Sequence, residues 1–370
     1  MATLVSGVFA TYACIGVEEE DTRDGLAQEA IAPPCDTCGL VLERMGELGD
    51  SGVTASTSGD AMFHPCGVSA IGDTILASAR PVGGGEIQLF TLDGVWLRSV
   101  GRPGQGPGEF GRDLRVIPTE SGGAVVVDRA LSRVTVFRAD WQVERVFHLE
   151  TRPDAHVIGS EGDLFVHSKP HPSEPGPVVR FSRVDLETGE VFPIVDGVVV
   201  SRLPELRDLD EWKMAAFPDA AFVAAQMWEY VITVFDRDGS AILTVARDAK
   251  WMPKQNIDAE FLEGMGETHP VPPVIRALHT DAAGNLWVYI LVPDAAWRPW
   301  PSRRSGPRWA TATYDTRVEI IDLGSRRVLA SGRFDEVIAP VCGSNYSFTV
   351  RETAEGDNVI ALLKVMPRGG

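Results

Sequence analysis

The feature that most constrains this chain is a repeated pair of strands. Five segments alternate apolar and polar residues and then run into a turn that contains Asp or Gly: Gly85–Gly94, Ser132–Asp140, Val178–Gly189, Tyr230–Gly239 and Thr316–Gly324. Alternation with a period of two predicts a strand with one buried face, and Asp and Gly tolerate the positive φ of tight turns. A second short strand pattern follows each segment, so each one predicts a β-hairpin.

A further strand pair precedes each hairpin, and the two pairs together form a unit of four strands. The first pair is clear in Gly67–Ala79, where the turn is Gly72-Asp73, and in Leu114–Asp128, where the turn contains Gly122-Gly123. Six units recur at a spacing of roughly 40 to 65 residues, which is typical of propeller blades. The sequence therefore predicts an all-β fold, namely a six-bladed β-propeller with four antiparallel strands per blade.

The sixth unit lacks an outer strand of its own after the predicted strand Asn358–Met366. The segment Gly39–Leu48 has strand character and no neighbouring partner in the sequence. Pairing these two segments would close the ring and remove the exposed edges of an open sheet. We therefore predict that the last blade is closed by this N-terminal strand.

One motif carries a family resemblance. Gly101–Phe110 reads Gly-Arg-Pro-Gly-Gln-Gly-Pro-Gly-Glu-Phe, and it is followed by a strand that ends in Val127-Asp128 and by the strand Arg133–Phe137. Over residues 85–150 this order resembles the NHL-type repeat of six-bladed β-propellers, which is found in many exported bacterial proteins. The relatives include RNA-binding modules, peptide lyases and extracellular sensor domains, so the resemblance implies a fold but selects no function.

The amino terminus predicts three consecutive segments. Residues 1–14 are mostly apolar or small and resemble a bacterial lipoprotein-type export signal, in which Ala13 precedes Cys14 as the lipidation site. The alternative is an apolar tail without a targeting role. Residues 15–34 are acidic and polar and predict a flexible tether, whereas residues 35–370 form the propeller. We expect an exported protein of the periplasm, the outer membrane or the cell surface, with a membrane tether if Cys14 is acylated.

Charge and motifs exclude several functions. The chain has 34 Lys and Arg against 52 Asp and Glu, and its net charge of −18 would repel the phosphates of nucleic acid. The glycines Gly104, Gly106 and Gly108 precede a strand instead of a helix, so we interpret them as an inter-blade turn and not as a phosphate loop. The sequence shows no catalytic or metal-binding signature, and we predict no catalytic residue, no metal ligand and no cofactor.

The cysteines predict disulfide bonds. With Cys14 set aside for lipidation, the candidates are Cys35, Cys38, Cys66 and Cys342, and an even number in an exported protein favours pairing in one of three connectivities. Free or buried thiols are one alternative. A second is a zinc site that combines Cys35, Cys38 and Cys66 with His64.

A segment rich in Trp and Arg interrupts the middle hairpin of the fifth unit. Its prolines and a glycine argue against a helix or a strand, so we predict a loop. Trp and Arg dominate the energetics of many interfaces. We therefore predict that this loop binds an envelope protein or an anionic or carbohydrate-like ligand; the alternative is that it folds over its own acidic propeller. The candidate binding residues are Trp297, Arg298, Trp300, Arg303, Arg304, Arg308 and Trp309.

These observations predict a monomeric, non-catalytic propeller at the bacterial cell envelope, which binds or senses a ligand or protein partner through one face. The alternative is a metal-dependent hydrolase or lyase, similar to the six-bladed lactonases, with a site in the axial channel. The histidines that such a channel could bring together are His64, His156, His167, His269 and His279.

Overall fold

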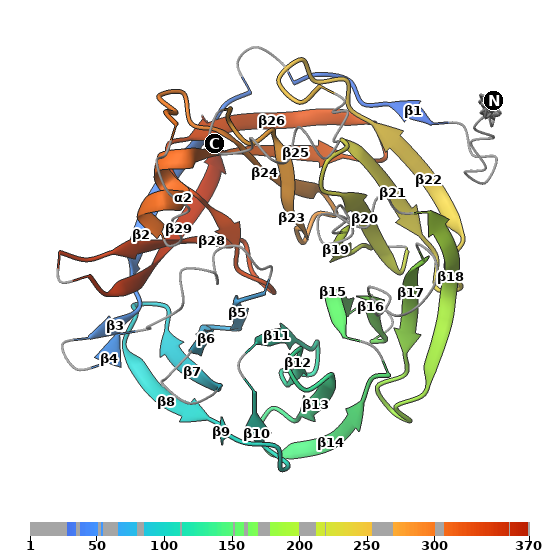
Figure 1. Cartoon of the computed structure of the whole chain (residues 1–370), viewed down its shortest axis with the longest axis vertical. Coiled ribbons are helices and arrows are strands. Elements are labelled where there is room, and N and C mark those ends of the chain that lie inside the picture. Colours follow the sequence, from blue (N-terminus) through green and yellow to red (C-terminus); the bar gives the residue numbers. More distant parts are fainter. Residues whose placement is uncertain are drawn as a thin grey trace, which may run out of the picture.

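The predicted strands form six antiparallel sheets around a central axis, which confirms the six-bladed propeller (Figure 1). The structure is a computed structural model of the chain. It describes residues 28–34, 38–50, 53–54, 66–79, 85–111, 113–150, 152–158, 162–168, 178–199, 212–218, 220–253, 269–299, 307–354 and 356–368.

Each blade contains four strands, which run outward from the axis in chain order in the first five blades. Blades 1 to 3 are made of β5 (Val68–Ile71), β6 (Thr74–Ala79), β7 (Glu86–Thr91), β8 (Trp96–Val100), β11 (Leu114–Pro118), β12 (Ala124–Asp128), β13 (Arg133–Phe137), β14 (Val143–His148), β15 (Pro153–Ile158), β16 (Leu164–Ser168), β17 (Val178–Val184) and β18 (Val191–Val199). Blades 4 and 5 are made of β19 (Trp212–Ala216), β20 (Phe222–Gln226), β21 (Val231–Phe235), β22 (Ala241–Ala246), β23 (Val274–Thr280), β24 (Leu286–Pro293), β25 (Tyr314–Asp322) and β26 (Arg327–Phe334).

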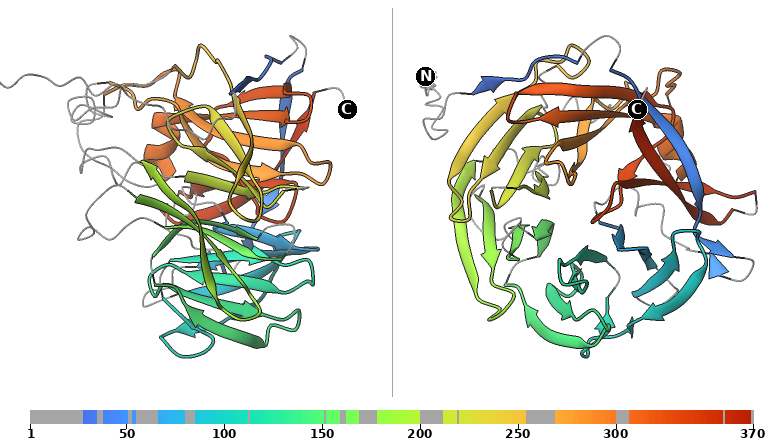
Figure 2. Two further views of the ribbon diagram at one scale, coloured as in Figure 1. Left: turned by 90° about the vertical axis from the view of Figure 1, so that its right-hand side faces the viewer. Right: turned by 180° about the vertical axis from the view of Figure 1, so that it is seen from behind.

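The sixth blade closes the ring as predicted. Its strands from the axis outward are β27 (Ala339–Pro340), β28 (Tyr346–Glu352), β29 (Asn358–Pro367) and β2 (Leu40–Glu47). The N-terminal strand β2 pairs with β29 in antiparallel orientation, from Leu40 opposite Pro367 to Glu47 opposite Ala361. Figure 2 shows the two ends of the colour range side by side at this blade.

Apolar side chains fill the junctions between neighbouring blades. One cluster of buried residues lies at each junction, because both faces of every sheet present apolar residues to the neighbouring sheets. At the junction of blades 3 and 4 the rings of Phe181, Phe222 and Phe235 stack, and Trp212 meets Phe181 edge-on at 5.4 Å between ring centroids.

The Gly-rich motif is the turn between blades 1 and 2. Two short strands, β9 (Arg102–Pro103) and β10 (Glu109–Phe110), pair across it, and the Phe110 ring is fully buried between the two blades. The Glu109 carboxylate accepts hydrogen bonds from the backbone N–H groups of Gly106 and Gln105 and pairs with Arg102. The hydrogen bonds and the charge of Arg102 lower the pKa of Glu109. The motif therefore has a structural role here, as interpreted from the sequence.

The N-terminal segment differs from the predicted tether in its last residues. β1 (Glu29–Ala30) lies parallel to β22 on the rim of blade 4, and the Val328 N–H donates to the Ala32 carbonyl at the rim of blade 5. Ile31 is only 5% exposed. The outer strands of these blades offer unpaired backbone groups, and Ile31 supplies an apolar side chain to bury, so residues 28–34 join the propeller. Residues 15–27 lie outside the described part of the chain.

The insertion of blade 5 also differs from the sequence prediction. A helix, α2 (Pro307–Thr313), precedes β25 and contacts β28 of the sixth blade. Pro307 occupies the first helical position, where the missing N–H has no intrahelical partner to lose, so this proline is compatible with a helix. Outside the blades there is also a short hairpin of β3 (Gly49–Asp50) and β4 (Val53–Thr54). In the described part of the chain no helix is both long and apolar enough to span a lipid bilayer.

Candidate functional site

The base of the Trp/Arg insertion is held by backbone hydrogen bonds. The Asp294 N–H donates to the Thr313 carbonyl at 2.9 Å, and the Trp297 N–H donates to the Asp294 carbonyl at 3.0 Å. Trp297 is half-buried and Arg298 is exposed. Trp300, Arg303 and Arg304 lie outside the described residues, as do the side chains of Arg308 and Trp309, whose backbone belongs to α2. The binding role of these seven residues stays a prediction.

Two of the four candidate cysteines form a bond across the first and last blades. Cys66 and Cys342 are joined by a disulfide with their Cα atoms 5.1 Å apart, and Cys38 is also disulfide-bonded. Cys35 and Cys14 lie outside the described residues. Because a disulfide sulfur is no thiolate ligand, this arrangement excludes the zinc site that combined Cys38 and Cys66.

Among the described residues, the histidines do not gather into a group of possible metal ligands. His167 is fully buried in the second strand of blade 3, where its ring lies 5.3 Å from that of Phe181. Burial lowers the pKa of His279 on β23 to about 4, so it is neutral at physiological pH. Within the described residues, no histidine belongs to a group of ligand atoms close enough to share a metal ion. His64 and the side chain of His156 are outside this description.

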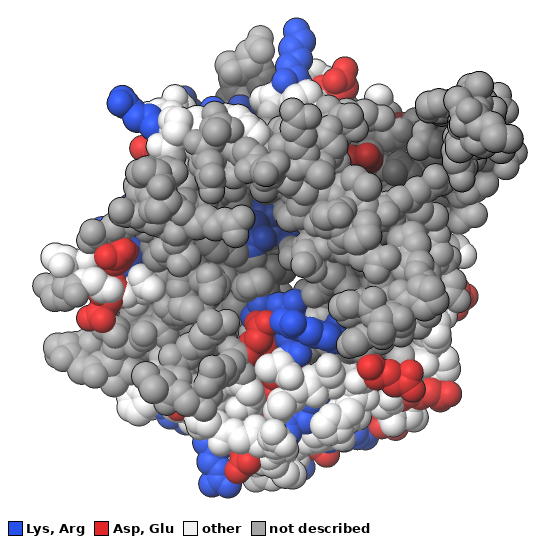
Figure 3. Space-filling model, in the orientation of Figure 1, with Lys and Arg blue, Asp and Glu red and all other residues white. Residues whose placement is uncertain are grey.

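Basic residues lie instead near the beginnings of the inner strands of blades 2 to 5. We call Arg115, Arg129, Arg152, Lys213 and Arg276 the axial basic cluster. Arg115 and Lys213 are the second residues of the inner strands β11 and β19, and both are buried. Arg276 lies in the inner strand β23, at a β-bulge where the register against β24 shifts between Ile275 and Ala277. Bulges re-aim side chains and are common next to functional sites. Figure 3 shows Lys and Arg side chains on both sides of a narrow opening at the centre of this face.

Asp113 is the carboxylate of this cluster. It forms ion pairs with Arg115 at 2.8 Å and with Arg129 at 2.9 Å, and Arg152 lies 3.6 Å away. Arg129 also donates to the Pro153 carbonyl of blade 3 at 2.7 Å. The Asp113 carboxylate thus positions arginines of blade 2 and of the segment before blade 3 at the end of the axial channel.

The charge of Arg115 interacts with charged side chains on both sides of the propeller axis. Burial lowers the pKa of Arg115 to about 10, and the charges of Arg129 and Arg276 act in the same direction, against the opposing effect of Asp113. Arg115 belongs to blade 2 and Arg276 to blade 5, which face each other across the axis. Arg115 is only 4% exposed, and its Nη2 has no hydrogen-bond partner among the described residues.

The buried Nη2 of Arg115, which lacks an acceptor among the described residues, favours binding of an anion. A buried donor without an acceptor carries a cost of about 1 to 3 kcal/mol, which an anionic acceptor at the axis would remove. A guanidinium also offers a planar pair of donors that matches a carboxylate or a phosphate. The axial basic cluster is therefore suited to bind an anion.

The sequence contains only a weak signal for this cluster. Each member is a single basic residue in a different blade, without local spacing that would mark it. An alignment of the six blades on their inner strands would have placed Arg115, Lys213 and Arg276 at similar positions.

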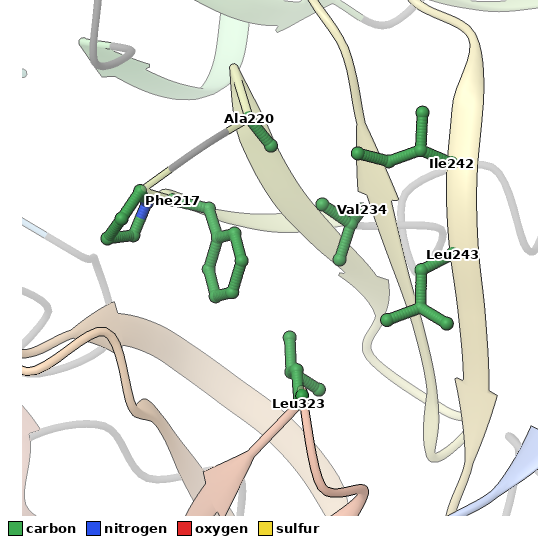
Figure 4. A pocket seen from close by; sticks show the side chains of 8 residues that line it. Phe217, Ala220, Val234, Ile242, Leu243 and Leu323 are labelled. Atoms are coloured by element: carbon green, nitrogen blue, oxygen red, sulfur yellow. The ribbon is translucent and has the colours of Figure 1, made fainter.

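An apolar pocket lies at the junction of blades 4 and 5 (Figure 4). Its residues Phe217 and Leu323 follow the ends of β19 and β25, whereas Lys213 of the axial basic cluster lies at the beginning of β19. The pocket has a volume of about 220 Å³, and its lining consists of Phe217, Pro218, Ala220, Val234, Ile242, Leu243, Leu323 and Gly324. Ligand sites usually add a few polar side chains that orient the ligand. This pocket has no polar side chain in its lining, so it is a weaker candidate than the axial basic cluster.

Comparisons with known proteins support the fold. No model of a known protein family matches the sequence, and no curated protein matches it either. Among solved structures, a member of the DUF4221 family from Bacteroides vulgatus aligns with a TM-score of 0.59 at 10% identity, over 90% of this chain and 99% of that chain. A candidate exported protein from Bacteroides fragilis aligns with a TM-score of 0.58 at 11% identity, over 92% of this chain and all of that chain. At this identity the likeness shows the fold alone, and the NHL-type assignment stays a prediction from the Gly101–Phe110 motif.

Proposed function

We propose that this protein is a non-catalytic binding propeller that recognises an anionic ligand, bearing carboxylate or phosphate groups, at the axial basic cluster. The observation that carries the proposal is Arg115, which is buried beside the axis with an Nη2 that has no acceptor among the described residues. Arg129 and Arg276 add positive charge around it. In a chain with a net charge of −18, a buried basic group at one place favours a dedicated anion site.

The insertion of blade 5 would extend this site. Arg276 is close enough to Tyr314 to influence its pKa, and Tyr314 directly follows α2. The insertion therefore returns to the blade beside the axial basic cluster. In the proposal, Trp297, Arg298 and the further Trp and Arg residues of this segment contact the same ligand by stacking and by charge.

We further propose that the protein acts outside the cytoplasm. Disulfides such as Cys66–Cys342 persist in oxidising compartments, and one structural neighbour is described as a candidate exported protein. Acylation of Cys14 would then tether the propeller to a membrane at the cell envelope.

The proposal is tested by isothermal titration calorimetry of the full chain with citrate and with inorganic phosphate, at constant ionic strength. The wild-type protein should bind at least one of these probes saturably. Arg115→Gln should weaken that binding at least about tenfold, because a charge-assisted hydrogen bond contributes about 1.5 to 3 kcal/mol. Arg152→Gln, at a side chain that is 63% exposed, should weaken binding less and leave the core intact.

The matched control is Arg138→Gln, which removes an exposed arginine that is ion-paired with Asp140 on the rim of blade 2. This variant should bind the probes as the wild type does. Absence of saturable binding of both probes, or equal affinities of Arg115→Gln, Arg152→Gln and Arg138→Gln, would overturn the assignment of the axial basic cluster as the binding site.

A further inference from the structure

Three carboxylates meet at the ends of three strands in blade 5. Asp294 directly follows β24, Asp315 is the second residue of β25, and Asp335 directly follows β26. One oxygen of each carboxylate lies within 4.8 Å of the others. We call these residues the carboxylate triad. It lies at the base of the Trp/Arg insertion, where the Asp294 backbone N–H donates a hydrogen bond to the Thr313 carbonyl.

Asp315 is the buried member of the carboxylate triad. It is only 5% exposed, and its Oδ2 accepts a hydrogen bond from Arg333 Nε at 2.5 Å. Its Oδ1 is buried and has no hydrogen-bond partner among the described residues. An acceptor oxygen in this state is costly, and a bound cation would satisfy it.

The charges around the triad are not balanced by the described contacts. Arg333 is the one cation that these contacts place against Asp315, and its Nη2 donates to the Pro293 carbonyl at 2.8 Å. Burial raises the pKa of Asp315, and the negative charges of Asp294 and Asp335 add to this rise against the effect of Arg333. One arginine against three carboxylates leaves a formal charge of about −2, which a divalent cation would neutralise.

We propose that Asp294, Asp315 and Asp335 hold a Ca²⁺ ion that joins the ends of β24, β25 and β26 at the base of the insertion. Ca²⁺ prefers oxygen ligands at about 2.3 to 2.6 Å, so oxygens within 4.8 Å of one another can share one ion. Ca²⁺ also tolerates irregular geometry and completes its shell with water and backbone carbonyls, whereas Mg²⁺ demands a near-ideal octahedron.

The ion would fix the part of blade 5 from which the insertion leaves. Asp294 and Thr313 are the two ends of that insertion, and Asp335 begins the connection to blade 6. A cation bound at this point would therefore couple the position of the Trp/Arg segment to the concentration of free calcium. This site is separate from the axial basic cluster and does not depend on it.

The test uses the full chain, treated with EDTA and dialysed, in calorimetric titrations with CaCl₂ and with MgCl₂. We expect Ca²⁺ to bind more tightly than Mg²⁺, and we expect Asp335→Asn and Asp294→Asn to weaken Ca²⁺ binding at least about tenfold. Ca²⁺ should also raise the melting temperature of the wild type by about 3 °C relative to EDTA, because a ligand that binds only the folded state stabilises it. Asp335 is exposed, so its substitution should preserve the fold.

The matched control is Asp238→Asn, which removes an exposed carboxylate in the turn after β21. It should keep wild-type Ca²⁺ binding, and so should Arg115→Gln, which separates this site from the proposed anion site. Absence of Ca²⁺ binding to the wild type would mean that the triad is stable without a bound cation. That result, equal binding by Asp335→Asn and Asp238→Asn, or tighter binding of Mg²⁺ than of Ca²⁺ would overturn the proposal.

Discussion

Strand β25 buries two carboxylates four residues apart, and they differ in how their charge is satisfied. Glu319 is fully buried and accepts hydrogen bonds from the Tyr230 hydroxyl at 2.9 Å and from Arg247 Nε at 3.2 Å. Its other oxygen accepts from Arg247 Nη2 at 3.4 Å. Asp315 has Arg333 on one oxygen and no described donor on the other, and two further carboxylates stand beside it.

The comparison separates a structural ionic group from a candidate binding site. Glu319 lies in the middle of the strand, where Tyr230 and Arg247 of blade 4 supply its donors and fasten the two blades together. Asp315 lies at the end of the strand, where the chain opens into an insertion. A buried charge whose donors come from the neighbouring blade needs no ligand, whereas a buried oxygen without a donor among nearby described residues is where a ligand would bind.

The largest effect is expected from Arg247→Met. This variant removes the partner of a fully buried carboxylate, and loss of one member of a buried pair costs about 3 to 5 kcal/mol. Arg317 also interacts electrostatically with Glu319 and would compensate in part, so we expect the lower end of that range. Urea denaturation with and without Ca²⁺ measures this loss. The loss of unfolding free energy should be the same with and without Ca²⁺. If Ca²⁺ restored the stability, Glu319 would not be a purely structural carboxylate distinct from the proposed Ca²⁺ site at Asp315.

A smaller effect is expected from Tyr230→Phe. The substitution keeps the ring, which packs against Trp251, and removes only the hydroxyl that donates to Glu319. A hydrogen bond to a charged acceptor contributes about 1.5 to 3 kcal/mol, so the free energy of unfolding should fall by about 2 kcal/mol. Urea denaturation is again the measurement, and an unchanged stability would show that Arg247 satisfies Glu319 without the tyrosine.

The smallest effect in the absence of calcium is expected from Asp315→Asn. The ion pair that it removes involves Arg333, whose side chain is 40% exposed, so solvent weakens the pair. The substitution also relieves repulsion from Asp294 and Asp335. In EDTA the free energy of unfolding should therefore change by less than about 1 kcal/mol. The rise in melting temperature on addition of CaCl₂ should disappear, and a rise that persists would remove Asp315 from the proposed site.

Most of the architecture could be predicted because local sequence patterns determine the strands and turns. Alternating apolar residues and Asp or Gly turns mark the strands of each blade, and the unpartnered segment Gly39–Leu48 indicated the closing strand. The helix α2 could not be predicted, because a segment with several prolines and a glycine indicates a loop, although proline suits a first helical position such as that of Pro307. The attachment of residues 28–34 could not be predicted, because they follow the acidic stretch that indicates a tether and Ile31 becomes buried only on the assembled rim.

Neither candidate site could be predicted, because the first is assembled by the closed ring and the second by the strand register within blade 5. Arg115 and Arg276 are distant in the sequence and approach only because blades 2 and 5 face each other across the axis. Asp294, Asp315 and Asp335 follow or begin three successive strands, and only the antiparallel register of blade 5 brings them to one edge. Residue types alone carried no such information, since aspartates at strand ends are common in turns.

The bond between Cys66 and Cys342 gives this chain the topology of a loop with two tails. Blades 1 to 5 and strand β27 lie between the two cysteines, whereas β2, β28 and β29 lie outside them. Strand β2 of the amino-terminal tail pairs with β29 of the carboxy-terminal tail to complete the sixth sheet. If the two tails separated, the other five sheets would still lie within a covalently closed ring. A protease that trimmed the amino-terminal tail would therefore remove β2 from the sixth sheet and β1 from the rim of blade 4 without opening the covalent ring.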